Sequence, residues 1–267
     1  MKKILITIVL VFTLGLFGCT TNDSTTLKIA ATSVPHAEIL EEAKPILLEE
    51  YDIELEIIVV QDYVTPNQFL DNGDVDANFF QHIPYLEAQI SDFGYEFTNV
   101  GGIHIEPIGV YSQKYNDIND LPDGATIIFS NSVADHGRIL SLLELAGLIK
   151  LDSSVDKIAA LVSDVVSNPK NLVFKSDIEA SLLPTAYNNS EGDAVIINTN
   201  YALQAGLNPL SDAILIEGEQ SPYVNVIAVR TQDKDLESIA DLVRVLQSNV
   251  IQSFIVEQYE GSVVPVG

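Results

Sequence analysis

The stretch that decides the fold covers residues 75–91 and has the sequence VDANFFQHIPYLEAQIS. Its first part, residues 75–80, carries a valine and two phenylalanines and is typical of a short buried strand. Pro84 follows and falls in the first turn of a helix that we expect to reach about Ser91, because a first turn does not need the N–H that proline lacks. A strand followed directly by a helix is the unit from which α/β sheets are built.

The same order of elements extends along the chain on both sides of this stretch. A first series of strands is expected at 27–31, 54–60, 75–80 and 97–103, with helices between them. A second series follows, with expected strands at 108–112, 125–130, 171–175, 194–198 and 224–230 and two closing helices at 236–247 and 249–258. Two successive series predict a two-lobed α/β protein with hinged lobes, each a mostly parallel sheet flanked by helices. Ligand sites in such sheets lie at the carboxyl ends of the strands.

The N-terminus has the pattern of a lipoprotein signal peptide. Lys2 and Lys3 precede a mostly apolar run over 4–17, which is short for a membrane-spanning helix. The run ends in Leu16-Phe17-Gly18-Cys19, which resembles the site read by lipoprotein signal peptidase. We therefore expect a signal peptide at 1–18, a lipid on Cys19 that holds the chain at the membrane, and a polar, flexible tether at 19–26.

Composition excludes several classes of partner. Cleavage after residue 18 would leave 249 residues, enough for one large domain or two ordinary ones. Such a chain would carry 11 basic and 38 acidic residues, a net charge of −27. This surface repels nucleic acid and anionic lipid, so neither is an expected partner. Cys19 is the only cysteine, so no intrachain disulfide is possible.

Signatures of catalysis are missing from the sequence. It has no Gly-x-Ser-x-Gly elbow, no phosphate loop, no Gly-x-Gly-x-x-Gly after a strand and no His-Glu-x-x-His. The four histidines, His36, His82, His104 and His136, lack the tight spacing of a strong metal motif. We expect a protein that is not an enzyme and holds no metal or cofactor. A metal receptor would require at least three of these histidines to converge.

Three short segments are better explained by capture of a small molecule. The residues after the strand at 75–80 supply an amide and an imidazole beside two phenylalanines. Arg138 falls in the first turns of a predicted helix, a position that suits an anion. Tyr223 and Asn225 open the late strand with an aromatic ring and an amide. Each residue alone has an ordinary structural explanation, but together they fit one type of ligand.

Eight segments follow one another in order through nearly the whole mature chain: VPHAEIL at 34–40, DYVTPN at 62–67, DANFFQHIPY at 76–85, HIEP at 104–107, LPDGA at 121–125, AGLI at 146–149, NPKNL at 168–172 and SPYVN at 221–225. By these segments the chain resembles the NlpA/MetQ-type family of methionine-binding lipoproteins, the solute receptors of methionine ABC importers.

This resemblance implies two lobes that close on a ligand like a hinge. The first lobe would comprise residues 27–106 plus 226–267, and the second lobe residues 107–225. It also implies a function: capture of L-methionine on the extracytoplasmic face of the cell membrane and delivery to the permease and ATPase subunits of an ABC importer, with the chain anchored through the lipid on Cys19.

The resemblance also implies how the polar end of methionine is bound. Arg138 would take the carboxylate with two parallel hydrogen bonds, the geometry that a planar guanidinium favours. Asn198 and Asn225 would accept from the ammonium through their side-chain oxygens. His104 would lie near the crossover between the lobes. We expect Arg138 to be exposed in the cleft, so that its replacement by alanine leaves folding largely intact.

Tyr63, Phe80 and His82 match the residues that line the side-chain pocket of the family. Relatives usually read Asn-Glu-Gly-Arg where this chain has Asp135-His136 before Gly137 and Arg138, which leaves open a related amino acid or a short peptide as the ligand. A metal receptor and an extracellular hydrolase on a similar scaffold are the further alternatives.

Overall fold

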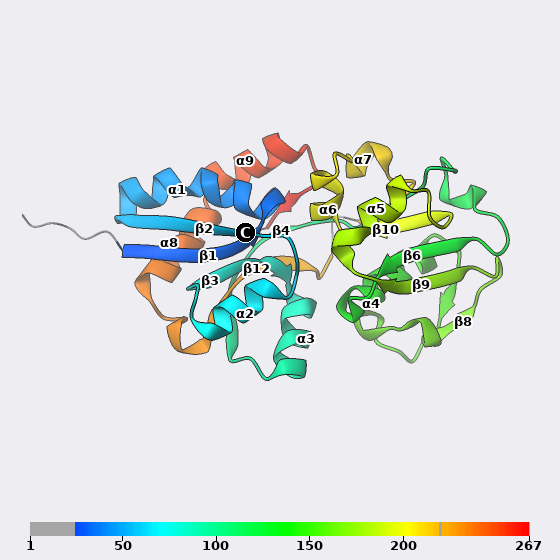
Figure 1. Ribbon diagram of the computed structural model, residues 1–267, viewed down its shortest axis with the longest axis horizontal. Coiled ribbons are helices and arrows are strands. Elements are labelled where there is room, and N and C mark those ends of the chain that lie inside the picture. The colour runs from blue at the N-terminus through cyan, green and yellow to red at the C-terminus, as the bar shows by residue number, and fades with distance from the viewer. Residues whose placement is uncertain (1–24, 219–220, 267) are drawn as a thin grey trace, which may run out of the picture.

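The computed structural model describes residues 25–218 and 221–266, which form two α/β lobes side by side along the long axis of the molecule (Figure 1). Each lobe is built on one sheet with helices on both faces. The predicted two-lobed α/β class is therefore confirmed. Cys19, the signal peptide at 1–18 and most of the predicted tether lie outside the described residues.

Six strands form the sheet of the first lobe. Their order is β13-β4-β12-β3-β1-β2. Their bounds are β1 (Thr25–Thr32), β2 (Ile53–Val60), β3 (Ala77–His82), β4 (Phe97–Ile105), β12 (Val224–Arg230) and β13 (Val264–Pro265). Five helices cover this sheet: α1 (Glu38–Tyr51), α2 (Thr65–Asn72), α3 (Ile83–Phe93), α8 (Glu237–Leu246) and α9 (Asn249–Tyr259).

The central strands of this sheet are buried on both faces, and alternate residues enter two different cores. In β1, Ile29 and Ala31 pack with α1, α8 and α9, whereas Ala30 packs with α2 and α3. In β12, Ile227 joins the first core and Val226 the second. Side chains of a strand point alternately to opposite faces, so strands with this burial must be apolar at nearly every position. Pro84 lies in the first turn of α3, as predicted.

Five strands form the sheet of the second lobe, in the order β11-β5-β10-β6-β9. Their bounds are β5 (Gly109–Tyr111), β6 (Thr126–Ser130), β9 (Val173–Ile178), β10 (Ala194–Ile197) and β11 (Leu215–Ile216). The helices of this lobe are α4 (Val133–Leu145), α5 (Leu183–Asn188), α6 (Thr199–Gln204) and α7 (Pro209–Asp212). A small hairpin of β7 (Lys150–Leu151) and β8 (Val165–Ser167) completes it.

The mostly parallel sheets were predicted, but the positions of the reversed strands were not. In the first sheet β12 runs antiparallel to both β3 and β4, between which it lies, and the short edge strand β13 runs antiparallel to β4. In the second sheet β5 runs antiparallel to β10 and β11. Of these strands, β5 and β12 are each the first strand that the chain forms after it passes from one lobe to the other. The chain enters each lobe from the side where the carboxyl ends of the other strands lie, so its first strand must run the opposite way.

Two predicted boundaries require correction. Thr25 and Thr26, assigned to the tether at 19–26, belong to β1 and pair with Ile53 and Glu54. Their polar side chains obscured this strand because they lie at its exposed end, where no core contact selects apolar residues. The proposed lobe boundary at 225/226 falls inside β12, since Asn225 already pairs with both β3 and β4.

Within residues 25–218 and 221–266 no single helix is long and apolar enough to cross a membrane. The bent pair α8 and α9, which meet at 46°, passes a test of length and composition only when the two are taken together.

Candidate ligand-binding site

A pocket with about 380 Å³ of empty space lies between the two sheets, where their strands end. Six of the seven residues predicted from the resemblance line it: Tyr63, Phe80, His82, Arg138, Asn198 and Asn225. His104, the seventh, is completely buried and lies behind Glu106, which itself lines the pocket.

Strand ends position most of these side chains. His82 is the last residue of β3, Glu106 follows β4, and Asn198 follows β10. Asn225 enters the same end of the first sheet because it pairs with His82 on one side and His104 on the other. The pocket thus lies at the carboxyl ends of strands, as expected for this class of sheet.

Arg138 comes from the second turn of α4 and is 5 % exposed, so the prediction of an exposed cleft arginine was wrong. Its Nε donates to Glu217 Oε2 at 3.1 Å, and its Nη2 donates to the same carboxylate and to the Glu106 carbonyl oxygen at 2.7 Å. Its guanidinium carbon lies 4.5 Å from the centre of the Tyr223 ring. These contacts use Nε and Nη2. Nη1 forms an ion pair with Asp135 Oδ1 at 3.9 Å, too long for a hydrogen bond, and is therefore the group that can still donate to a ligand.

Gly137 allows α4 to approach the neighbouring chain closely. A Cβ on this residue would lie 2.2 Å from the carbonyl oxygen of Ile158 and 2.4 Å from that of Lys157. Real side chains essentially never come so close to backbone oxygens, so any larger residue would push the helix and this segment apart. The glycine that precedes Arg138 therefore fixes where the arginine enters the pocket.

Asp135 connects the two lobes. Its Oδ1 accepts from His82 Nε2 of the first lobe at 3.0 Å, and its Oδ2 accepts from Asn198 Nδ2 at 3.1 Å. Only 1 % of Asp135 is exposed. Burial alone would raise its pKa, but the hydrogen bond from His82 and the nearby charge of Arg138 outweigh burial and hold the pKa of Asp135 at about 2. Asp135 is thus an ionised carboxylate in the wall of the pocket.

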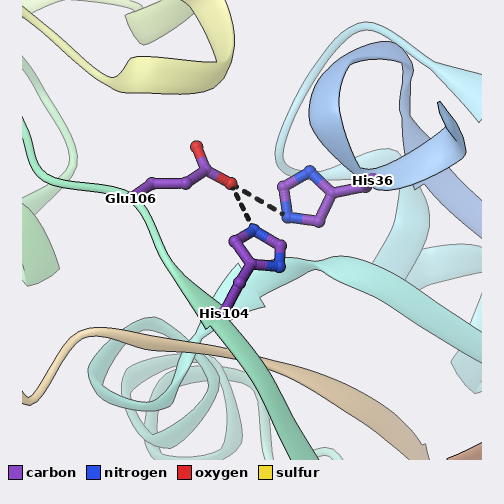
Figure 2. Close-up of side chains that lie close together, drawn as sticks. All are labelled: His36, His104 and Glu106. Atoms are coloured by element: carbon purple, nitrogen blue, oxygen red, sulfur yellow. Dashed lines mark hydrogen bonds and ion pairs between the residues drawn. The ribbon is translucent and has the colours of Figure 1, made fainter. Parts of the chain in front are cut away.

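Glu106 is held from behind by two histidines, as Figure 2 shows. Its Oε1 lies 2.8 Å from His104 Nε2 and 3.3 Å from His36 Nε2. Burial lowers the pKa of His36 to about 4 and that of His104 to about 3, so both rings are neutral at neutral pH. Burial raises the pKa of Glu106, and the charge of Arg138 opposes that rise.

The donor atoms of this cluster could also hold a metal ion, since they lie within 4.8 Å of one another. Two histidines converge there, fewer than the three that the metal-receptor alternative requires. His82 instead bonds Asp135, and His136 bonds the carbonyl oxygen of Ser130. A metal on Nε2 of His104 would also place a proton on its Nδ1, a buried atom without a hydrogen-bond partner among the described residues.

Aromatic rings form the opposite wall of the pocket. The ring centres of Tyr63, Phe80 and Tyr85 are 6.0–6.1 Å apart in every pair. Tyr63 also donates its hydroxyl hydrogen to Asn200 Oδ1 at 2.6 Å. This wall offers an apolar, polarisable surface next to the polar groups of Arg138, Asp135 and Glu106.

Two buried polar atoms at the pocket have no hydrogen-bond partner in the described part of the chain. They are Asn198 Oδ1, an acceptor, and Asn200 Nδ2, a donor. An unpaired buried polar group costs roughly 1–3 kcal/mol, and such groups usually mark a place where a ligand or water binds.

Asn225 differs from its predicted role, because its Oδ1 already accepts from His36 Nε2 at 3.2 Å. Its Nδ2, a donor, is the atom left for a ligand.

Sequence reasoning did not assign Glu106, Asp135 and Asn200 to the ligand. Glu106 is two residues from His104 in an extended segment, so both side chains point the same way, and this spacing was the available signal. Asp135 lies three residues before Arg138 on one helix face. No local signal marks Asn200.

Comparisons with known proteins agree on one family. The model of the NlpA lipoprotein family matches residues 27–267. The methionine-binding lipoprotein MetQ of Bacillus subtilis is 47 % identical, with 100 % of this chain and 99 % of the relative covered. The D-methionine-binding lipoprotein MetQ of Escherichia coli is 36 % identical, with 96 % and 94 % covered. A nutrient-binding protein of Burkholderia cenocepacia, solved bound to methionine, is 40 % identical, with a TM-score of 0.85 over 90 % of this chain and 100 % of that one. The resemblance drawn from short segments is confirmed, and the chain belongs to the NlpA lipoprotein family.

Proposed function

We propose that this protein binds free methionine between its lobes and delivers it to an ABC importer. The observation that carries the proposal is that groups of both charges line one pocket beside aromatic rings. Arg138 lines the pocket together with the carboxylates of Asp135 and Glu106, and its Nη1 lies 3.9 Å from Asp135 Oδ1. An α-amino acid carries the complementary pair, a carboxylate and an ammonium, on one carbon.

The unpaired amide atoms fit the same ligand. Asn200 Nδ2 and Asn225 Nδ2 are donors for the ligand's carboxylate, and Asn198 Oδ1 is an acceptor for its ammonium. Because Arg138 shares its other edge with Glu217, we propose that the carboxylate receives one hydrogen bond from Nη1 and others from amides. This replaces the two-pronged contact expected from the sequence.

The aromatic wall suits the side chain of methionine. A thioether sulfur about 5 Å from an aromatic ring gains roughly 0.3–1.5 kcal/mol per contact. Tyr63, Phe80 and Tyr85 present three rings at one point of the pocket. His82 is hydrogen-bonded to Asp135, and its ring packs against the ring of Tyr223 at 5.0 Å between ring centres. The names of the Bacillus subtilis relative and of the methionine-bound neighbour support the same ligand.

Location and partners complete the proposal. We infer that Cys19 carries the lipid that anchors the chain on the extracytoplasmic face of the cell membrane. The family of lipoproteins to which the chain belongs supports this inference. We further propose that permease and ATPase subunits of a methionine importer receive the ligand, and that the two lobes close around it by a hinge where the chain passes between them.

A thermal-shift screen tests the proposal. A ligand that binds only the folded protein stabilises it by about 2.7 kcal/mol at a hundred times its Kd. We expect L-methionine to give the largest or one of the largest shifts among the twenty amino acids, D-methionine and a set of methionine-containing dipeptides. A shift with zinc or manganese but with none of the amino acids would contradict the proposal and favour a metal receptor.

A further inference from the structure

We propose that His36 and His104 are positioning residues, which hold Glu106 and Asn225 from behind in the orientation that receives the ligand. Neither histidine lines the pocket, and they are 1 % and 0 % exposed. Both rings meet the same oxygen of Glu106, and the other oxygen points away from them (Figure 2). This inference rests on the proposed function, because the groups positioned are those that would contact methionine.

The hydrogen bonds determine which ring nitrogen carries the proton. Carboxylate and amide oxygens only accept, so Nε2 must be the donor to Glu106 in His104 and the donor to Asn225 in His36. Nδ1 of a neutral ring is then an acceptor. In His36 it accepts from the Thr32 hydroxyl at 2.7 Å. In His104 it has no partner among the described residues. One tautomer thus satisfies every contact except that single acceptor.

His36 also fixes Asn225. Its Nε2–H donates to Asn225 Oδ1 at 3.2 Å, and Glu106 Oε1 lies 3.3 Å from the same nitrogen. An amide group whose oxygen is held in this way must present its NH₂ elsewhere, and Asn225 lines the pocket. One histidine therefore positions an acceptor, the Glu106 carboxylate, and a donor, the Asn225 amide nitrogen. These are the two kinds of group that a zwitterion needs.

The donors that reach the Glu106 carboxylate, His104 Nε2 and the backbone N–H of Asn200, should also keep it ionised. Burial opposes ionisation of this carboxyl group, and hydrogen bonds to the charged form favour it. Loss of one donor would raise the pKa of Glu106 further, and a protonated Glu106 is a poor acceptor for an ammonium. The ionisable groups that face or interact with Glu106 are His36, His104, His82, Arg138, Tyr63 and Tyr259.

Calorimetric titration of the full-length protein in detergent with L-methionine, at pH 7.5 and 5.5, tests the inference. In His104→Leu the donor is lost. We expect Kd to rise about ten-fold or more at pH 7.5, since a hydrogen bond to a charged group is worth roughly 1.5–3 kcal/mol. The ratio of this Kd to the wild-type Kd should be larger at pH 5.5. His104→Gln places an amide donor close to the former Nε2 and should bind nearly as wild type at both pH values.

His136→Leu is the matched control. His136 is also buried and also donates from Nε2, but to the Ser130 carbonyl oxygen, and it does not line the pocket. Its loss should lower the unfolding temperature without changing the Kd for methionine. If His104→Leu does not fold, His104→Asn serves instead, because its shorter amide cannot reach Glu106 as that of His104→Gln can.

The outcomes separate the two proposals. Wild-type protein that does not bind methionine would overturn the proposed function and this inference with it. Wild-type protein that binds methionine, with His104→Leu or His104→Asn binding equally well at both pH values, would overturn the positioning role alone. A loss of affinity that is the same at pH 7.5 and 5.5 and is not recovered in His104→Gln would show a merely structural role and would also overturn it.

Discussion

Replacement of Asp135 by asparagine should destabilise the protein by an amount that depends on pH. The pKa of Asp135 is about 2 in the folded chain, against an ordinary value of 3.8. A carboxyl group whose pKa is lower in the folded state stabilises that state above its unfolded pKa, and the contribution is lost as pH falls through the folded pKa. This shift corresponds to about 2 kcal/mol at pH 7, of which about half should remain at pH 3.

Urea unfolding of the ligand-free wild type and Asp135→Asn at pH 7, 5, 4 and 3 measures this difference. We expect Asp135→Asn to be about 2 kcal/mol less stable at pH 7 and 5, because His82 and Asn198 lose the charge that accepts their hydrogen bonds. The gap between the two proteins should narrow at pH 4 and pH 3. A difference that stays constant across these pH values, or the absence of any difference at pH 7, would refute the assignment of Asp135 as a buried, ionised link between the lobes.

Three further predictions concern single residues. Gly137→Ala should destabilise the protein by about 1–3 kcal/mol in urea unfolding, because the new Cβ meets the carbonyl oxygens of Lys157 and Ile158; the stabilisation that alanine gives at an ordinary helical position would contradict this. Arg138→Lys should weaken methionine binding about ten-fold or more in calorimetry, because an ammonium cannot serve a ligand and Glu217 with the geometry of a guanidinium. Binding of methioninol, which lacks the carboxylate, should change little, and equal losses for both ligands would contradict the placement. Cys19→Ser should leave the protein uncleaved or released, and a variant that still partitions into detergent with the acyl mass would refute lipidation at this residue.

Local signals were sufficient to predict most strands and helices of the fold. The strand predicted at 75–80 is observed at Ala77–His82, and the helix with Pro84 in its first turn begins at Ile83. Both were predictable to within two or three residues because proline and burial act locally. The clustering of site residues at strand ends was also predictable, since the carboxyl ends of parallel strands must meet at one edge of the sheet.

Contacts between distant segments were not predictable from these signals. Arg138 pairs with Glu217, 79 positions away, and a chain with 38 acidic residues offers no local sign of which one will be the partner. The contact between His82 and Asp135 joins two lobes and likewise depends on how they meet. The reversal of β5 and β12 follows from the path of the chain between lobes, which periodicity does not report.

The region between α4 and β9 was the least predictable part of the fold. The short strands β7 and β8 are two and three residues long, and the region buries only scattered side chains such as Leu151 in β7 and Ala160 in the segment that follows. Segments of this length show neither the period of a strand nor that of a helix. Their structure is determined by packing against the core of the second lobe, including the close contact at Gly137.

Calorimetric titration of the purified wild-type chain with L-methionine at neutral pH tests the central claim most directly. The account predicts saturable binding of one methionine per chain, with weak binding of methioninol because it leaves the donors around Arg138 without a carboxylate. A folded protein that gives no binding heat at any temperature tested and no thermal shift up to millimolar methionine would contradict the claim that this pocket is a methionine site.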